Sequence, residues 1–288
     1  MPEERAVNSE PLSPPPAEAA IEPQAPAAPE ERTPASQERP EAVLVKPMLP
    51  EPAPAHPPQN PTSAEQAVSS DLPGPERAKA AAERVRPALE KALADKGLHF
   101  GDPVFLRAFK EEGQVELWVR NRGTKKYEHF RTWDVAAQSG KPGPKLAEGD
   151  GQVPEGFYFV GPTAMKPDST FHLAFNIGYP NAYDQHHGRT GSFIMIHGNC
   201  VSIGCLAMTD PKIEEIYTLC DAALKNGQPY FRVNLFPFRM TDERLAREAY
   251  NPWFDFWTNL KEGYDRFEHS HVPPEAEVNE KSGRYEFK

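Results

Sequence analysis

Basic residues are scarce in this 288-residue sequence, which has 32 lysines and arginines against 42 acidic residues and a formal net charge of -10. A nucleic-acid-binding protein needs a basic face that neutralises phosphates, so the composition argues against a nucleic-acid partner. The sequence also has no nucleotide-binding motif. The adjacent His186 and His187 have no carboxylate or thiol at zinc spacing, so they predict no metal site. We therefore expect neither a cofactor nor a metal.

Long apolar runs are absent as well. No stretch is long enough to cross a membrane. The first thirty residues lack the basic segment and the following apolar segment of a secretory signal. Taken by itself, this pattern is typical of a cytoplasmic protein.

Cysteine occurs three times, at Cys200, Cys205 and Cys220. Small secreted domains held by disulfides use many paired cysteines, so this low and odd count excludes a disulfide framework. Cys220 falls on the apolar face of a predicted helix and is expected to be an inert packing residue. Three interpretations of Cys200 stay open: a core residue, a neighbour of the reactive site, or a redox partner.

Proline is unevenly distributed, because residues 1–75 hold 19 of the 33 prolines together with 12 acidic and four basic side chains. That segment contributes -8 of the net charge of -10. It has almost no apolar periodicity, and such a sequence cannot bury enough surface to offset its ordering entropy. We predict a disordered Pro/Ala/Glu-rich spacer over residues 1–74 and a globular domain with a C-terminal helical extension over residues 75–288.

The globular part has short runs that alternate apolar and polar residues, which predicts strands. Helices are predicted where apolar residues recur every three or four positions, and Asp210 is the expected N-cap before Pro211. The expected fold class is α+β and β-rich, with a mixed, mostly antiparallel sheet and flanking helices. The predicted helices are 75–97, 210–227 and 242–264, and the predicted strands are 104–109, 115–119, 127–133, 154–160 and 229–236.

The stretch 194–210 gathers residues that can carry chemistry. The apolar run at 193–196 predicts a short buried strand that ends at His197. Gly204 lets the backbone turn tightly immediately before Cys205. A thiol with an imidazole beside it is the minimum for nucleophilic catalysis by cysteine. A lone Cys beside a lone His is more often core packing, so the surrounding pattern has to decide.

The pattern consists of His-Gly at 197–198 and Ser-Ile-Gly-Cys-Leu-Ala at 202–207. It resembles the signature of the YkuD-type L,D-transpeptidase family, which is His-Gly followed by Ser-His-Gly-Cys, an apolar residue and Arg. Two positions depart from that signature, because Ile203 stands where the family has His and Ala207 where it has Arg. The departures and the short gap between the two halves resemble the YafK-like branch of the family.

The resemblance covers about residues 85–288 and implies the catalytic fold of that family and a cysteine acyltransferase or amidase. His197 would take the proton of Cys205, and the thiolate would form a thioester with a diaminopimelate-containing stem peptide of peptidoglycan. Backbone N–H groups near Gly204 and Cys205 would hold the oxyanion, with Ser202 and Gly198 as positioning residues. A backbone carbonyl would orient the imidazole. Such a thiolate–imidazolium pair is expected to react fast with iodoacetamide below pH 7.

Substrate recognition needs another cation, because Ala207 replaces the arginine that binds a stem carboxylate in the family. Arg189, in the loop before the predicted strand, is the candidate, and a solvated loop arginine is the equal alternative. Tyr179, Asn181 and Asp184 combine turn-forming with hydrogen-bonding side chains. They are expected either to form a turn or to line the substrate cleft.

The expected reaction is hydrolysis, because the YafK-like branch includes hydrolases that release lipoprotein from peptidoglycan, and because Ala207 and the short gap weaken an acceptor site. The alternatives are an L,D-transpeptidase that forms cross-links and a non-catalytic wall-binding module. The expected partners are peptidoglycan stem peptides and a wall-linked outer-membrane lipoprotein. The resemblance also implies the periplasm or cell envelope. Either a removed leader or a start farther upstream would then account for the missing signal.

Overall fold

A computed structural model describes residues 72–200 and 204–288. Residues 1–71 of the predicted spacer and Ser202 lie outside the described residues, and the division of the chain at residue 75 stays a prediction. The first described helix is α2 (Gly74–Ala94), with a proline in its first turn, where the missing N–H has no helical partner to lose. It continues through Pro87, which the sequence predicted to start or kink a helix.

Five strands form the first sheet in the order β3-β2-β1-β10-β5. β1 and β10 run parallel, and the other neighbours run antiparallel. All six residues of the central β1 are buried, as expected for a strand covered on both faces of its sheet. The strands are β1 (Val104–Phe109), β2 (Gln114–Arg120), β3 (Tyr127–Asp134), β5 (Gly156–Val160) and β10 (Phe231–Phe236).

Five shorter strands form the second sheet in the order β4-β9-β8-β7-β6. β8 and β9 run parallel, and the other pairs are antiparallel. This sheet brings segments far apart in the sequence next to the stretch 194–210. The strands are β4 (Ala137–Gln138), β6 (Met165–Lys166), β7 (Ala174–Asn176), β8 (Met195–His197) and β9 (Leu206–Ala207).

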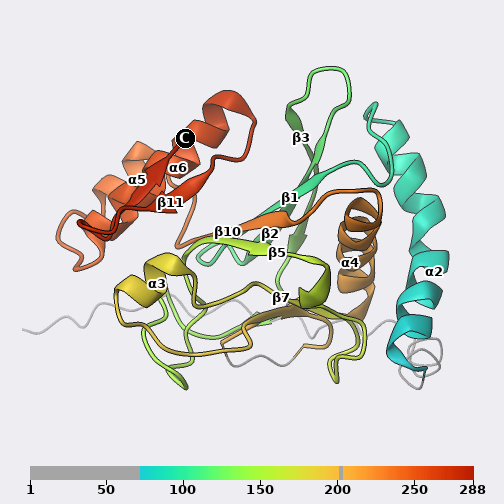
Figure 1. Ribbon diagram of the computed structural model, residues 1–288, viewed down its shortest axis with the longest axis horizontal. Helices are drawn as coiled ribbons and strands as arrows, with labels where there is room; N and C mark the ends of the chain where they lie inside the picture. The colour runs from blue at the N-terminus through green and yellow to red at the C-terminus, as the bar shows by residue number, and fades with distance from the viewer. Residues whose placement is uncertain (1–71, 201–203) are drawn as a thin grey trace, which may run out of the picture. The chain divides into compact units, whose positions relative to one another are not determined.

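The helices cover the ends of these sheets, and Figure 1 shows α2 and α4 side by side at one end and α5, α6 and β11 at the other. One apolar cluster combines side chains of both sheets with α2 and α4. A second cluster packs α6 against Phe109 and Phe236 of the first sheet. The remaining elements are η1 (Pro162–Ala164), α3 (Ala182–His186), α4 (Asp210–Lys225), α5 (Asp242–Ala246), α6 (Phe254–Ser270), β11 (Ala276–Val278) and β12 (Tyr285–Phe287).

The predicted α+β, strand-rich class with flanking helices is confirmed, and its strands divide into two sheets plus the β11–β12 hairpin. Among the described residues, no helix is long and apolar enough to cross a membrane. Asp210 is not the N-cap of α4: Thr209, at φ 74°, occupies that position, and Asp210 is the first helical residue. Its side chain has a different use, described with the site below.

Candidate active site

The parallel pairing of β8 with β9 brings the two predicted catalytic residues together. Ile196 pairs with Leu206 and His197 pairs with Ala207, so Cys205 follows in register opposite Met195, whose N–H donates to Cys205 Sγ (3.4 Å). Side chains alternate between the faces of a strand. Cys205 and His197 therefore project from one face, while Ile196 and Leu206 are buried on the other. That the thiol and the imidazole lie within hydrogen-bond reach stays a prediction.

The imidazole of His197 is held by its neighbours in one orientation. Its Nδ1 lies 2.5 Å from the carbonyl oxygen of Gly198. A carbonyl only accepts, so Nδ1 carries the proton and a neutral ring keeps Nε2 as its basic nitrogen. The ring of Phe171 lies against the imidazole, with 4.8 Å between the ring centroids. The backbone carbonyl that the resemblance implied is therefore present, and it leaves the second nitrogen to act as a base.

Gly198 is needed because the chain is crowded at this point. A Cβ at this residue would lie 2.6 Å from Asp210 Oδ1 and 2.8 Å from the carbonyl oxygen of Phe171. The same Asp210 oxygen accepts from the N–H of Asn199 (2.7 Å). The side chain of Asp210 thus fixes the turn after His197, and only glycine leaves room for that contact.

The N–H of Gly204 has a partner within the fold, and an oxyanion site made by backbone N–H groups near Gly204 and Cys205 stays a prediction. The Gly204 N–H donates to Ser139 Oγ (2.6 Å), so this donor is already engaged. The Ser139 hydroxyl in turn donates to the carbonyl oxygen of Gly151 (2.6 Å). Gly204 has φ +80°, a conformation that glycine adopts without strain. The backbone immediately before Cys205 is therefore fixed by a serine 65 positions away in the sequence.

Replacing Ser139 with alanine is expected to lower kcat while KM changes little. An N–H left without a partner in a half-buried site costs about 1–3 kcal/mol, equivalent to about 5- to 150-fold in rate if the ordered backbone is lost. Ser139→Thr keeps the hydroxyl and is the matched control. The measurement is steady-state kinetics with thermal melting of all three proteins. Equal kcat in Ser139→Ala and wild type would show that the contact is not needed for catalysis.

Burial shifts the pKa values of Cys205 and His197 in opposite directions. It raises the pKa of the Cys205 thiol, an effect that the Met195 N–H and the charge of Lys145 reduce in part. Burial also lowers the pKa of His197, and the Gly198 carbonyl reduces that effect. Both directions favour a neutral thiol and a neutral imidazole. A resting thiolate–imidazolium pair stays a prediction, and these directions favour transfer of the thiol proton to His197 during the attack.

The iodoacetamide reactivity of Cys205 is accordingly expected to be slow below pH 7 and to rise with pH. Only the thiolate reacts, and a raised thiol pKa means that the rate should climb about tenfold per pH unit without a plateau near neutrality. The measurement is the alkylation rate of the Cys205 peptide by mass spectrometry between pH 6 and pH 9. A rate that is already maximal at pH 6 would restore the thiolate–imidazolium interpretation.

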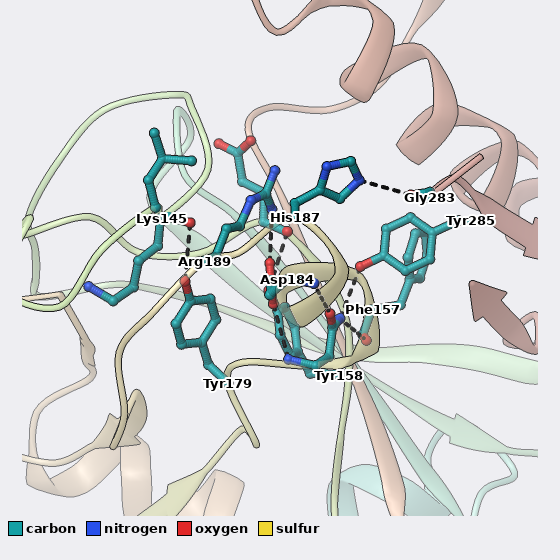
Figure 2. A network of polar contacts seen from close by, with 12 residues as sticks. Lys145, Phe157, Tyr158, Tyr179, Asp184, His187, Arg189, Gly283 and Tyr285 are labelled. Atoms are coloured by element: carbon teal, nitrogen blue, oxygen red, sulfur yellow. Dashed lines mark hydrogen bonds and ion pairs between the residues drawn. The ribbon is translucent and has the colours of Figure 1, made fainter. Parts of the chain in front are cut away.

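Arg189 does not offer a charge to a substrate, contrary to the sequence-based expectation. It is buried, and its Nη1 lies 2.8 Å from Asp184 Oδ1. Figure 2 shows the pair at the centre of a polar network in which the Tyr158 hydroxyl donates to the other Asp184 oxygen (2.9 Å). Asp184 is fully buried. Both charges are paired and covered in this structure. The expected place of Asp184 on the rim of the substrate cleft stays a prediction.

Tyr179 and Asn181 are also used within the fold. The Tyr179 hydroxyl donates to the carbonyl oxygens of Lys145 (3.2 Å) and Thr190 (3.3 Å). Asn181 is the N-cap of α3, and its side chain accepts a hydrogen bond from the N–H of Asp184. This contact agrees with the expectation that these residues form a turn. These contacts shape the loop that leads to β8. As substrate-binding residues, Tyr179 and Asn181 stay predictions.

Lys145 is the cation that sequence reasoning missed. Its ammonium group is 2.7 Å from Asp150 Oδ1, and its side chain is 4% exposed. Burial raises the pKa of Asp150, but hydrogen bonds from Lys145 and from three backbone N–H groups lower this pKa to about 2. The charge of Lys145 also lowers the pKa of Cys205. In the sequence, Lys145 stands in a segment rich in glycine and proline, which indicates a loop and gives no signal of a charge near the site.

Comparison with known sequences shows which protein family this chain is similar to. The family model for the YkuD L,D-transpeptidase catalytic domain matches residues 106–235. An Escherichia coli K12 protein named "Putative L,D-transpeptidase YafK" is 46% identical over 185 residues, which are 64% of this chain and 74% of that protein. The protein of the same name from Escherichia coli O157:H7 gives the same figures.

Two solved structures are more distant. The helical cell shape determining protein Pgp2 from Campylobacter jejuni is 18% identical, with a TM-score of 0.39 over 63% of this chain and 75% of that one. Bd1075 from Bdellovibrio bacteriovorus is also 18% identical, with a TM-score of 0.34 over 58% of each chain. At these scores, neither structure adds to the description of the site.

Proposed function

Because this chain belongs to the L,D-transpeptidase catalytic-domain family, which acts on peptidoglycan, we propose that it is a cysteine enzyme that cleaves amide bonds of peptidoglycan stem peptides through a thioester on Cys205. The observation that supports the proposal is the parallel pairing of β8, which ends at His197, with β9, which begins directly after Cys205. The imidazole is oriented by the carbonyl of Gly198. A function related to peptidoglycan follows from the family alone.

The reaction starts from a neutral pair. His197 Nε2 accepts the thiol proton as Cys205 Sγ forms a bond to the amide carbonyl carbon. The C–N bond then breaks, and the imidazolium returns the proton to the leaving amine. Water attacks the thioester in the second half of the reaction, with His197 again as the base, and the free acid and the thiol are regenerated. No group outside this chain is needed apart from substrate and water.

Hydrolysis is favoured over transfer to a second peptide. A transpeptidase has to hold an amine acceptor beside the thioester, and in the family an arginine two residues after the cysteine grips a stem carboxylate. Here that residue is Ala207, which is fully buried in β9. The nearby cation, Lys145, is paired with Asp150. An acceptor carboxylate therefore has no unpaired cation at these two positions, whereas water needs none.

The proposed substrate is a diaminopimelate-linked peptide, including the linkage to an outer-membrane lipoprotein, and the proposed location is the periplasm or cell envelope. The test is mass spectrometry of muropeptides after incubation of lipoprotein-bearing sacculi with the purified full chain. Loss of lipoprotein-derived remnants from the muropeptides supports the amidase. New cross-links between stem peptides would replace it with a transpeptidase, and binding without any change in muropeptides would indicate a wall-binding module.

A further inference from the structure

Phe193 has a backbone conformation that bulky residues rarely adopt. Its φ is +53°, in the left-handed region where a large side chain is strained. The residue is 69% exposed, so burial in the core does not explain the strain. Strain of this kind persists where the surrounding structure over-determines it, and it clusters at functional sites. A specific contact of the Phe193 backbone suggests why it is kept.

That contact is with the nucleophile. Cys205 Sγ donates to the carbonyl oxygen of Phe193 (3.7 Å). The next residue is fixed as well, because the carbonyl oxygen of Ile194 accepts from the N–H of Ile177 (3.0 Å). The backbone with this positive φ brings the Phe193 carbonyl to the thiol and leaves the residue largely exposed. The backbone of an exposed aromatic residue consequently lies against the thiol of the catalytic pair.

A second exposed aromatic stands on the imidazole side. Phe171 is 41% exposed and lies against His197. Its turn is held from α2, because Arg77 Nη1 donates to the carbonyl oxygens of Ser169 and His172 (2.8 Å each). Among the described residues, seven large hydrophobic side chains are exposed. Of these residues, Phe171 contacts His197 through its ring, and Phe193 contacts Cys205 through its backbone carbonyl. Exposed apolar surface of this kind marks binding sites.

We propose that Phe193, with Phe171 across the catalytic pair, forms an apolar subsite for the uncharged aliphatic part of the acyl group that is transferred to Cys205. The acyl portion becomes bonded to Sγ, which contacts the Phe193 carbonyl, so the exposed side chain of the same residue is the proposed apolar contact for that portion. The proposal rests on the proposed function for the identity of the natural substrate. The subsite itself is a property of the surface around Cys205 and can be tested without peptidoglycan.

The test compares two alkylating reagents, iodoacetamide and its N-hexyl derivative, on the full chain. The rate constant at Cys205 is measured for each by fragmenting the alkylated peptide in the mass spectrometer, because Cys200, which is exposed, lies in the same tryptic peptide. Wild type is expected to prefer the hexyl reagent about tenfold, because covering a few methylenes is worth that much. Phe193→Asn removes the ring but tolerates positive φ, and it should bring the ratio near one. Phe193→Tyr should keep the preference.

The matched control is Tyr250→Asn, because Tyr250 is a fully exposed aromatic away from these contacts. It should leave the preference unchanged, and melting curves check that each variant is folded. The same preference in wild type, Phe193→Asn and Tyr250→Asn would overturn the subsite, whatever the muropeptides show. Loss of the preference in Phe193→Asn with unchanged muropeptides would leave the subsite standing and refute the proposed function. The two failures are therefore distinguishable.

Discussion

Replacing Cys205 with alanine is expected to abolish turnover, with a fall in kcat of about 10⁴-fold or more, while the fold is retained. The thiol is the atom that forms the covalent bond in the proposed reaction, and no other described cysteine can substitute for it. Cys220 is fully buried in α4 and Cys200 is an exposed residue after β8. The measurement is muropeptide release with melting curves of both proteins.

The control for this experiment is Cys220→Ala. Cys220 packs in the apolar cluster, and burial raises its pKa well above the ordinary value, so the thiol is not a nucleophile near neutral pH. This variant should lose about 1 kcal/mol of stability and keep its kcat. If Cys205→Ala keeps its activity, or if Cys220→Ala loses its activity while folded, the assignment of the nucleophile is wrong.

Replacing Lys110 with methionine is expected to lower the free energy of unfolding more than Ser139→Ala or Cys220→Ala does. The ammonium group of Lys110 is buried and contacts the carbonyl oxygens of Gly143 (2.6 Å) and Val153 (2.7 Å) and the carboxylate of Glu155 (3.0 Å). Glu155 is fully buried. Removing one partner leaves an uncompensated buried charge, which costs about 3–5 kcal/mol. In a domain of this size the melting temperature should fall by roughly 10 °C.

The loop that carries Ser139 and Lys145 depends on this pair. Glu155 also accepts from the Gly143 N–H (2.7 Å) and from Trp257 Nε1 (2.8 Å). The double variant Lys110→Met/Glu155→Gln removes both charges and should recover at least about half of the lost stability. Chemical denaturation of the two variants measures the difference. A single variant within about 1 kcal/mol of wild type would show that the pair is not critical.

The strand at 195–197 and the helix over 210–225 could be predicted, because their signals are local. A short apolar run ends at His197, and Pro211 marks the first turn of α4. The family signature placed the two catalytic candidates within nine residues, so the chain did not need to fold for them to be found. Short-range patterns of this kind survive in any tertiary context that buries the apolar face.

The contacts that tune the site could not be predicted, because they depend on tertiary structure. The Ser139 hydroxyl reaches Gly204 only because β4 pairs with β9. In the sequence, Arg189 was a candidate for substrate binding or a solvated loop arginine. In the structure it is paired with Asp184 and lies over the rings of Tyr183 and Phe256. The pKa directions of Cys205 and His197 follow from burial, which residue types alone do not reveal.

The proposed thioester on Cys205 is tested most directly by trapping this intermediate. Wild-type protein is mixed with an excess of purified stem-peptide substrate, quenched in acid within the first turnover and digested. We expect an added acyl mass on the Cys205 peptide that neutral hydroxylamine removes, and no adduct or product with Cys205→Ala. Product formed at the same rate by both proteins, with no adduct on the Cys205 peptide, would contradict it.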